Sequence, residues 1–371
     1  MKILLIFGTR PEGIKFAPII QELQETEIET VLVNTGQHKE MLEEVENLFK
    51  ISSNYNLGLM KPNQSLEELT SEMVREIGKV LDKEKPDLVL VLGDTATTFS
   101  GAYTSFLQRI PVGHIEAGLR TEHISSPFPE EMFRRLVTKI SDFHFAPTEV
   151  NKKNLLAEGV PAENIFITGN SVIDALYIIT SRPFNFPENL QKIYSKDKRV
   201  ILVTTHRREN FHKLKGIYEA INSLVEEFDD IEVVFPVHPN PNVRKLVQEH
   251  FPSNSKSSSI HLIEPLSYEC FVHAMKNSYL IITDSGGIQE EAPALDIPVL
   301  VIRDSTERIE GLQSGTLKLV GTEKESLLLE ARKLLKIPEE YMAMSQAKNP
   351  YGDGTTSKQI VSVLHNILNK K

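Results

Sequence analysis

The sequence predicts two α/β domains, each built on a parallel sheet whose strands are connected by helices on both faces. Three observations lead to this prediction. The chain has 371 residues, more than one compact domain usually holds, and 40% of them are apolar, which is enough for two cores. Short runs rich in Val, Ile and Leu recur along the chain, as in strands buried on both faces. Segments with helical periodicity separate these runs, as crossover helices do in doubly wound domains.

Two series of strands are expected. The first series comprises residues 2–7, 30–34, 87–92, 112–115, 143–146 and 164–168, and the second comprises residues 200–204, 232–237, 260–263, 279–283, 299–302 and 317–320. Residues 181–198 carry two prolines and several charges, so we expect them to form the joint between the sheets. The predicted domains are residues 1–170 and 171–355, with a C-terminal helix in 356–371 that packs back on the first domain.

The clearest helix begins at Ser65, where Ser-Leu-Glu-Glu has the form of a capping box. Its apolar residues then recur at helical spacing: Leu66, Leu69, Met73, Ile77 and Val80.

Composition excludes several classes of function. A net charge of -10 and a pI near 5.7 disfavour nucleic acid or an anionic membrane as partner. Cys270 is the single cysteine, so no intrachain disulfide and no cysteine metal cluster can form, and a reducing, cytoplasmic location is expected. The N-terminal run is interpreted as the first strand and not as a signal peptide. No apolar run approaches the roughly 20 residues that a membrane span requires.

The most informative motif follows the expected strand 279–283. Ser285, Gly286 and Gly287 come next, and a helix carrying Glu290 and Glu291 is expected after them. Glycines let the backbone approach a ligand, and the first N–H groups of a helix bind anions, so the turn suits a diphosphate. A carboxylate one turn further on suits a ribose diol. The alternative is an ordinary strand-to-helix turn.

In the first domain, polar residues follow three strands, at the edge where open α/β sheets bind ligands. Arg10 and Lys15 follow the first strand, in a segment that is not a G-x-G-x-x-G fingerprint, so no redox cofactor is expected. Asp94, Glu116 and Glu130 bring carboxylates to the same edge. Asp94 has the alternative role of a helix N-cap, and Glu130 that of an acid in a first helical turn.

In the second domain, His206, Arg207 and Arg208 follow one strand and His238 follows the next. A histidine with two arginines at a strand end suits a diphosphate, although one arginine is expected to pair with Glu209. The histidines lack partners at ligand spacing, so no metal site is predicted. Arg308 is a further candidate for the phosphate.

Eight motifs together resemble the non-hydrolysing UDP-N-acetylglucosamine 2-epimerases. They are GTRPE (8–12), GQH (36–38), GDT (93–95), HIEAGLRT (114–121), PFPEE (127–131), THRREN (205–210), DSGGIQEEA (284–292) and RDSTER (303–308). The motifs run in family order across nearly the whole chain. The resemblance implies a GT-B-type fold of two Rossmann-like domains, with the active site in the cleft between them, and a homodimer.

The resemblance also implies the binding residues. The family's substrate-binding positions fall on Arg10, Lys15, Asp94, Glu116, His206, Leu266, Phe271, Ser285, Gly286, Gly287, Glu291 and Arg308. Leu266 takes a place where some members have Gln near the uracil. A possible allosteric site for a second substrate molecule matches Gln37, His38, Arg207 and His238.

The activity implied is reversible epimerisation of UDP-N-acetylglucosamine at carbon 2, which supplies surface polysaccharide synthesis. The family's route eliminates UDP to give 2-acetamidoglucal and then adds UDP back, with no cofactor. Neutralising the departing diphosphate suits His206 and the other cations. Proton transfer on two faces requires two groups, for which Asp94, Glu116 and Glu130 are the candidates, with base and acid unassigned.

Three other functions remain open at this point. A UDP-sugar glycosyltransferase would use the same fold and the same clamp but would require an acceptor. A hydrolysing epimerase would release free N-acetylmannosamine and UDP. A nucleotide-sugar-binding regulator would bind UDP without turnover, and its carboxylates would then have no task.

Overall fold

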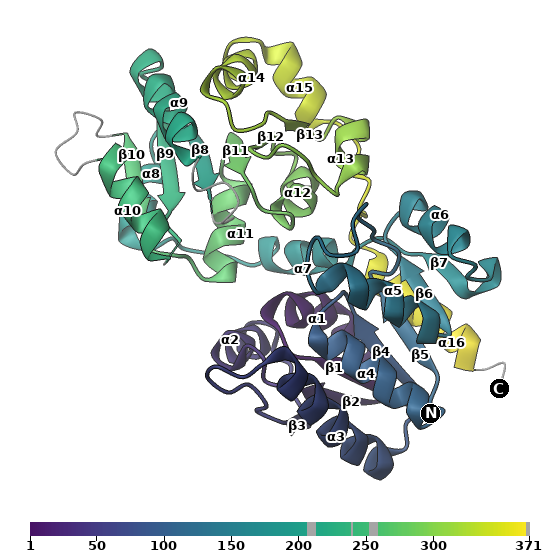
Figure 1. Cartoon of the computed structure of the whole chain (residues 1–371). Coiled ribbons are helices and arrows are strands. Elements are labelled where there is room, and N and C mark those ends of the chain that lie inside the picture. Colours follow the sequence, from purple (N-terminus) through teal and green to yellow (C-terminus); the bar gives the residue numbers. More distant parts are fainter. Residues whose placement is uncertain (206–212, 239, 252–258, 369–371) are drawn as a thin grey trace. The chain divides into compact units, whose positions relative to one another are not determined.

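The computed structural model describes residues 1–205, 213–238, 240–251 and 259–368 (Figure 1). The chain divides into two compact units. Unit 1 comprises Met1–Ala175 and Tyr351–Lys371, and unit 2 comprises Leu176–Pro350. Each unit contains one parallel sheet with helices on both faces, so the predicted α/β class is confirmed.

Unit 1 contains seven strands within the described residues, in the order β3-β2-β1-β4-β5-β6-β7. The strands are β1 (Lys2–Phe7), β2 (Glu29–Asn34), β3 (Tyr55–Asn56), β4 (Leu88–Leu92), β5 (Val112–Ile115), β6 (Phe143–Ala146) and β7 (Ile165–Ile167). The helices are α1 (Arg10–Gln24), α2 (Lys39–Phe49), α3 (Leu66–Glu84), α4 (Ala96–Leu107), α5 (Glu130–Ile140), α6 (Glu149–Ala157), α7 (Ser171–Thr180) and α16 (Thr356–Leu368), with a short 3-10 helix η1 (Ala162–Asn164).

Alternation along β1 sends side chains to two cores. Leu4 and Ile6 pack in a cluster with residues of α3, α4 and α5. Phe7 points to the other face, where its ring lies 6.1 Å from that of Phe16 on α1. Because side chains alternate along a strand, this pattern places α1 and α4 on opposite faces of the sheet. The capping box predicted at Ser65 is confirmed, since its hydroxyl accepts from Glu68 N and Glu68 Oε2 accepts from Ser65 N.

The last helix belongs to unit 1. α16 packs beside α1 and buries Ile360 and Leu364. Its first turn is held by Asp174 of α7, whose Oδ1 accepts from Ser357 N at 2.7 Å. Nearby, Asn170 N donates to Tyr351 O at 2.7 Å. The C-terminal segment is therefore part of the first unit's core.

Unit 2 contains six strands within the described residues, in the order β10-β9-β8-β11-β12-β13. The strands are β8 (Arg199–Thr204), β9 (Ile231–Pro236), β10 (Ile260–Ile263), β11 (Leu280–Thr283), β12 (Val299–Val301) and β13 (Leu317–Leu319). The helices are α8 (Glu188–Tyr194), α9 (Leu214–Glu227), α10 (Pro241–His250), α11 (Tyr268–Lys276), α12 (Ile288–Glu291), α13 (Ile309–Ser314), α14 (Lys324–Lys336) and α15 (Pro338–Ser345), with a 3-10 helix η3 (Ala292–Leu295).

One expectation about local structure needs correction. The joint predicted at 181–198 contains α8, which buries Leu190 and Ile193, and the division between the units falls within α7. The helix expected after Gly287 is confirmed as α12, which carries Glu290 and Glu291 and is followed by η3. Pro293 accounts for the end of the α-helix, because proline lacks the N–H that an α-helix requires and disfavours helical geometry in the residue before it.

Candidate active site

The strand order places two connections of unit 1 where a ligand is expected to bind. β1 lies between β2 and β4, and the helices that follow β1 and β4 cover opposite faces of the sheet. Open α/β sheets bind ligands beyond the strand ends at such a switch of direction. Arg10 and Lys15 follow β1, and Asp94 follows β4. Unit 2 repeats the arrangement, because β8 lies between β9 and β11, and Ser285, Gly286 and Gly287 follow β11.

Gly8, the first residue after β1, has no room for a side chain. A Cβ there would lie 2.0 Å from Oγ1 of Thr35 and 2.4 Å from Oγ1 of Thr97. These two hydroxyls are hydrogen-bonded to each other at 2.9 Å. The glycine therefore lets the ends of β1 and β2 and the first turn of α4 approach one another.

Glu12 ties the β1 connection to the β4 connection. Its side chain is buried and accepts hydrogen bonds from Gly8 N (2.9 Å), Thr9 N (2.7 Å) and Thr9 Oγ1 (2.9 Å). From the other connection, Thr95 Oγ1 and Thr98 Oγ1 donate to it at 2.5 and 3.0 Å. Burial raises the pKa of Glu12, while these donors act against that shift. The loop that carries Arg10 is thereby fixed to the turn that carries Asp94.

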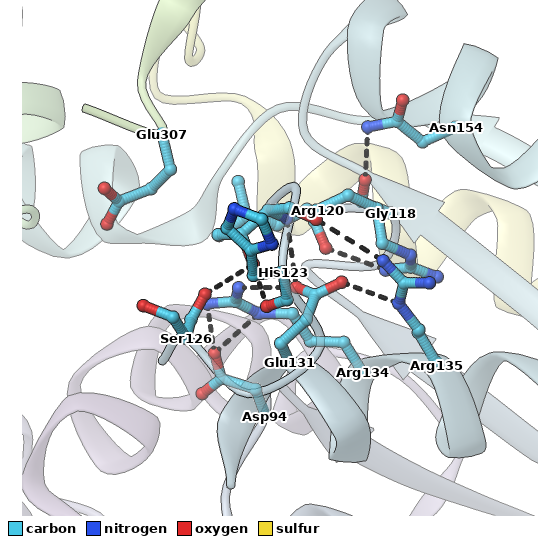
Figure 2. A network of polar contacts seen from close by, with 12 residues as sticks. Asp94, Gly118, Arg120, His123, Ser126, Glu131, Arg134, Arg135, Asn154 and Glu307 are labelled. Atoms are coloured by element: carbon cyan, nitrogen blue, oxygen red, sulfur yellow. Dashed lines mark hydrogen bonds and ion pairs between the residues drawn. The ribbon is translucent and has the colours of Figure 1, made fainter. Parts of the chain in front are cut away.

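Asp94 is held by a buried arginine of α5, as Figure 2 shows. Arg134 donates from Nε and Nη2 to the same oxygen, Oδ2, at 2.8 and 2.6 Å. The guanidinium is anchored in turn by Glu131, a fully buried carboxylate whose Oε2 accepts from Arg134 Nη1 and from Thr121 N, each at 3.1 Å. Glu131 Oε1 accepts from Arg135 Nε at 2.9 Å. Asp94 thus belongs to an ordered ionic network and not to a helix cap, which Thr95 supplies.

Glu116 stands directly after β5 in a left-handed conformation, with φ 62°. Few residues other than glycine adopt this conformation, and the strain is typical of functional positions. Its carboxylate forms an ion pair with Nζ of Lys15 on α1. Two residues later Gly118 has φ 92°, and a Cβ there would lie 2.4 Å from the carbonyl oxygen of Asn151. The turn is therefore fixed on both sides of Glu116.

Glu130 begins α5 and is half-buried. Its Oε2 is buried, and among the described residues no hydrogen-bond partner faces it. Phe133, one turn later, points into the core and stacks on Phe99 with ring centroids 5.2 Å apart. The three candidate carboxylates thus differ, since Asp94 is held by an arginine, Glu116 by a lysine, and Glu130 has an oxygen without a partner in the described part of the chain.

His114 has a structural task. The ring is completely buried in β5, and Nε2 donates to the carbonyl oxygen of Gly93 at 2.8 Å. Burial lowers the pKa of His114 to about 3, so the ring is neutral at physiological pH. It fixes the end of β5 beside the turn that precedes Asp94.

Of the four allosteric candidates, Gln37 and His38 belong to unit 1 and His238 to unit 2. Gln37 Oε1 accepts from Thr97 Oγ1 at 3.3 Å, and His38 Nδ1 accepts from Arg10 N at 3.4 Å. Burial, assisted by Arg10, lowers the pKa of His38. His238, in unit 2, accepts from Asn240 N at 3.2 Å. Arg207 lies outside the described residues, and so does the binding candidate His206.

In unit 2 the turn after β11 is held mainly by side chains. Ser285 N donates to Thr283 Oγ1 at 2.9 Å, and Gln289 Nε2 donates to Ser285 O at 3.0 Å. Glu291 is buried and accepts from the Tyr268 hydroxyl at 2.9 Å. Because α12 has only four residues, its dipole is weak, and an anion at this turn would depend on local N–H groups and nearby cations.

Arg308 lies against this glycine turn. A Cβ on Gly286 would be 3.4 Å from Cζ of Arg308 and 3.4 Å from Oε1 of Glu307. Arg308 Nε donates to Glu290 Oε1 at 2.8 Å, and its Nη1 donates to Glu307. Arg303 Nη1 donates to the other oxygen of Glu307 at 3.0 Å. The structure thus brings Arg308 to Gly286, as the sequence predicted for two parts of one phosphate site.

The two remaining candidates, Leu266 and Phe271, are half-buried. Phe271 lies on α11, whose N-cap Ser267 accepts from Cys270 N at 3.3 Å.

Sequence reasoning missed four side chains that hold the candidates in place: Glu12, Glu131, Arg134 and Glu307. Glu290 was expected in the helix after the glycine turn, but its contact with Arg308 was not. Glu12 carried a local signal, since a threonine followed three residues later by Glu has the form of a capping box. Over the described residues, no group of three or more His, Cys, Asp or Glu is arranged to hold a metal ion. None of the helices described there is long and apolar enough to cross a membrane.

Comparisons with known proteins identify the family of the chain. A family model described as UDP-N-acetylglucosamine 2-epimerase matches residues 21–365. The chain is 48% identical over 372 residues to the UDP-N-acetylglucosamine 2-epimerase of Neisseria meningitidis, covering 98% of this chain and 99% of the relative. The crystal structure of a Neisseria meningitidis UDP-GlcNAc 2-epimerase bound to UDP-GlcNAc is similar with a TM-score of 0.90 and 47% identity, covering 99% and 100% of the two chains. A Methanocaldococcus jannaschii UDP-GlcNAc 2-epimerase in complex with UDP-GlcNAc and UDP is similar with a TM-score of 0.80 and 37% identity, covering 99% and 100%.

Proposed function

Since the chain belongs to the UDP-N-acetylglucosamine 2-epimerase family and is an isomerase, we propose that it interconverts UDP-N-acetylglucosamine and UDP-N-acetylmannosamine by elimination and re-addition of UDP. The bond between carbon 1 and the phosphate oxygen breaks, and its electron pair leaves with UDP. A base takes the proton from carbon 2, which gives 2-acetamidoglucal. UDP then adds back to carbon 1 while a proton returns to the other face of carbon 2. No oxidant is required, and the product would supply surface polysaccharide synthesis.

The observation that best supports the proposal is the position of three carboxylates along neighbouring strands of unit 1. Asp94 follows β4, Glu116 follows β5, and Glu130 begins the helix that leads from β5 to β6. Removing a proton from one face and returning it to the other requires two groups, and general acid–base catalysis contributes about 10²–10⁴-fold each time it is used. Glu130, whose Oε2 has no hydrogen-bond partner among the described residues, is well suited to meet a substrate.

In unit 2 the proposed task is to hold UDP. The N–H groups of Gly286 and Gly287, with Arg308 beside them, would neutralise the diphosphate as it departs. Glu291 would accept from the ribose diol, and Phe271 and Leu266 would face the base. Arg10 and Lys15 of unit 1 are further cations for the diphosphate, and His206 is proposed to assist its departure.

The test is a proton NMR time course of the purified protein with UDP-N-acetylglucosamine in deuterated water, without an acceptor sugar or NAD. UDP-N-acetylmannosamine with deuterium at carbon 2 is the expected product. Unchanged substrate without exchange at carbon 2 would contradict the proposal for this sugar. Free N-acetylmannosamine would identify a hydrolysing epimerase instead.

We also propose that the protein is a homodimer that uses α4 and α5. Large apolar side chains are exposed on these two packed helices: Tyr103, Phe106, Leu107, Met132 and Leu136. Exposed large apolar side chains on neighbouring helices are typical of protein–protein contacts. Light scattering should give twice the chain mass for the wild type and the single chain mass for Phe106→Glu. The matched control is Leu329→Glu, which places the same charge at an exposed leucine of α14.

A further inference from the structure

We infer that the two carboxylates that pair with Arg308 have opposite effects on diphosphate binding: Glu290 positions the arginine for the ligand, whereas Glu307 occupies the ligand's place until the ligand arrives. This inference rests on the proposed function of the Ser285–Gly287 turn as a UDP site. It assigns to Glu290 and Glu307 roles that act through Arg308.

The position of Glu307 is the first observation. Its Oε1 lies 3.4 Å from the point where a Cβ on Gly286 would stand, so the carboxylate lies against the glycine turn. The same carboxylate pairs with Nη1 of Arg308 and, through Oε2, with Nη1 of Arg303 at 3.0 Å. An anion that approaches the turn and Arg308 therefore meets a negative group that is already bound to both arginines.

Glu290 provides the contrast. It is 5% exposed, lies within α12, and accepts from Nε of Arg308 at 2.8 Å. Nε is the guanidinium nitrogen closest to the arginine stem, so this bond fixes the side chain's direction while its outer nitrogen contacts Glu307. Glu307 lies instead on the connection between β12 and α13. When Glu307 gives way, the Glu290 pair would still hold Arg308 beside Gly286.

Electrostatics then determines whether each substitution strengthens or weakens diphosphate binding. Two like charges about 4 Å apart repel strongly even at the effective dielectric constant of a protein surface. Glu307→Gln keeps the size of the side chain but removes the negative charge that a diphosphate must displace, so binding should tighten about tenfold or more. Glu290→Gln weakens the pair that orients Arg308, so diphosphate binding should become weaker.

The experiment is calorimetric titration of UDP, and separately of inorganic pyrophosphate, into the wild type, Glu307→Gln, Glu290→Gln and Asp304→Asn. Asp304 pairs with Lys213 at 2.5 Å and is largely exposed, so its variant removes an equal charge close by without touching Arg308. We expect a lower Kd for Glu307→Gln with both ligands, a higher Kd for Glu290→Gln, and a change of less than about twofold for Asp304→Asn.

Several outcomes would overturn the inference. Glu307→Gln with unchanged or weaker binding shows that Glu307 orients Arg308 and does not compete with the ligand. Equal tightening in Asp304→Asn shows a general charge effect. If Glu290→Gln does not fold, the titration of Glu307→Gln alone still tests whether Glu307 competes with the ligand. A wild type that binds neither ligand would refute the proposed UDP site itself, a result distinct from the failure of this inference.

Discussion

Replacing Gly118 by alanine should destabilise unit 1 much more than the same change at Gly159. Both glycines have left-handed backbones, with φ 92° and 86°, so both variants carry the conformational cost of about 1–2 kcal/mol for a side chain in that region. The space around them differs. A Cβ on Gly118 would lie 2.4 Å from Asn151 O and 3.0 Å from Cγ of Leu155, whereas nothing lies within 4 Å of a Cβ on Gly159.

The clash at Gly118 involves backbone and cannot be relieved by turning a side chain. α6 would have to move, and forced repacking of this kind costs about 1–3 kcal/mol. At about 2–4 °C per kcal/mol for a unit of this size, Gly118→Ala should melt roughly 2–12 °C below Gly159→Ala. The Asn154 amide that donates to Gly118 O at 2.9 Å should weaken as well. Differential scanning calorimetry measures both variants, and equal losses of Tm would refute the reasoning.

Three further predictions follow from the same contacts. Arg134→Ala should lower the free energy of unfolding by about 1–3 kcal/mol, because buried Glu131 loses one of its two arginines and Asp94 loses its cation. The exposed Arg75→Ala should stay within about 0.5 kcal/mol. Urea titration measures both variants, and equal effects would exclude the buried network. Burial lowers the pKa of folded His114 to about 3, below the unfolded value of about 6.5, so the contribution of neutral His114 to stability is complete above pH 6.5 and is lost as pH falls toward 3. Between pH 6 and 4, the free energy of unfolding of His114→Gln should therefore fall less steeply than that of the wild type, by about 1.4 kcal/mol per pH unit. Parallel profiles would contradict this. Glu130→Gln should reduce kcat by about 100-fold or more while UDP binding stays intact. The control Glu122→Gln, at an exposed position, should keep the wild-type kcat in the same steady-state epimerisation assay. Near wild-type turnover in Glu130→Gln would exclude Glu130 from the mechanism.

The strands were predictable because parallel strands buried on both faces have a simple composition. Every strand expected from the sequence is present, and the one that was missed, β3, has only two residues and so carries no pattern. The helix expected after Gly287 is present as α12 and carries both Glu290 and Glu291. Local rules therefore predicted these elements well.

The side-chain contacts that hold the candidate residues could not be predicted from the sequence. Asp94 meets Arg134 only because the order β4-β5-β6 brings α5 beside the end of β4. Arg308 meets Glu290 across a contact between two connections of the second sheet. No periodicity or spacing encodes such pairs. The motifs indicated candidates for the ligand, whereas the contacts that hold these candidates became visible only in three dimensions.

The return of α16 to unit 1 has a consequence for the order in which the two units can form during synthesis. Unit 2 is one continuous stretch, so all of its residues have left the ribosome before Tyr351 follows. Unit 1 begins the chain but must wait for its last helix, which covers α1 and is held by Asp174. Domains generally fold as units during translation, so the half that is made first would be completed last. Until then, the apolar side of α1 that α16 covers would be open to water or to a chaperone.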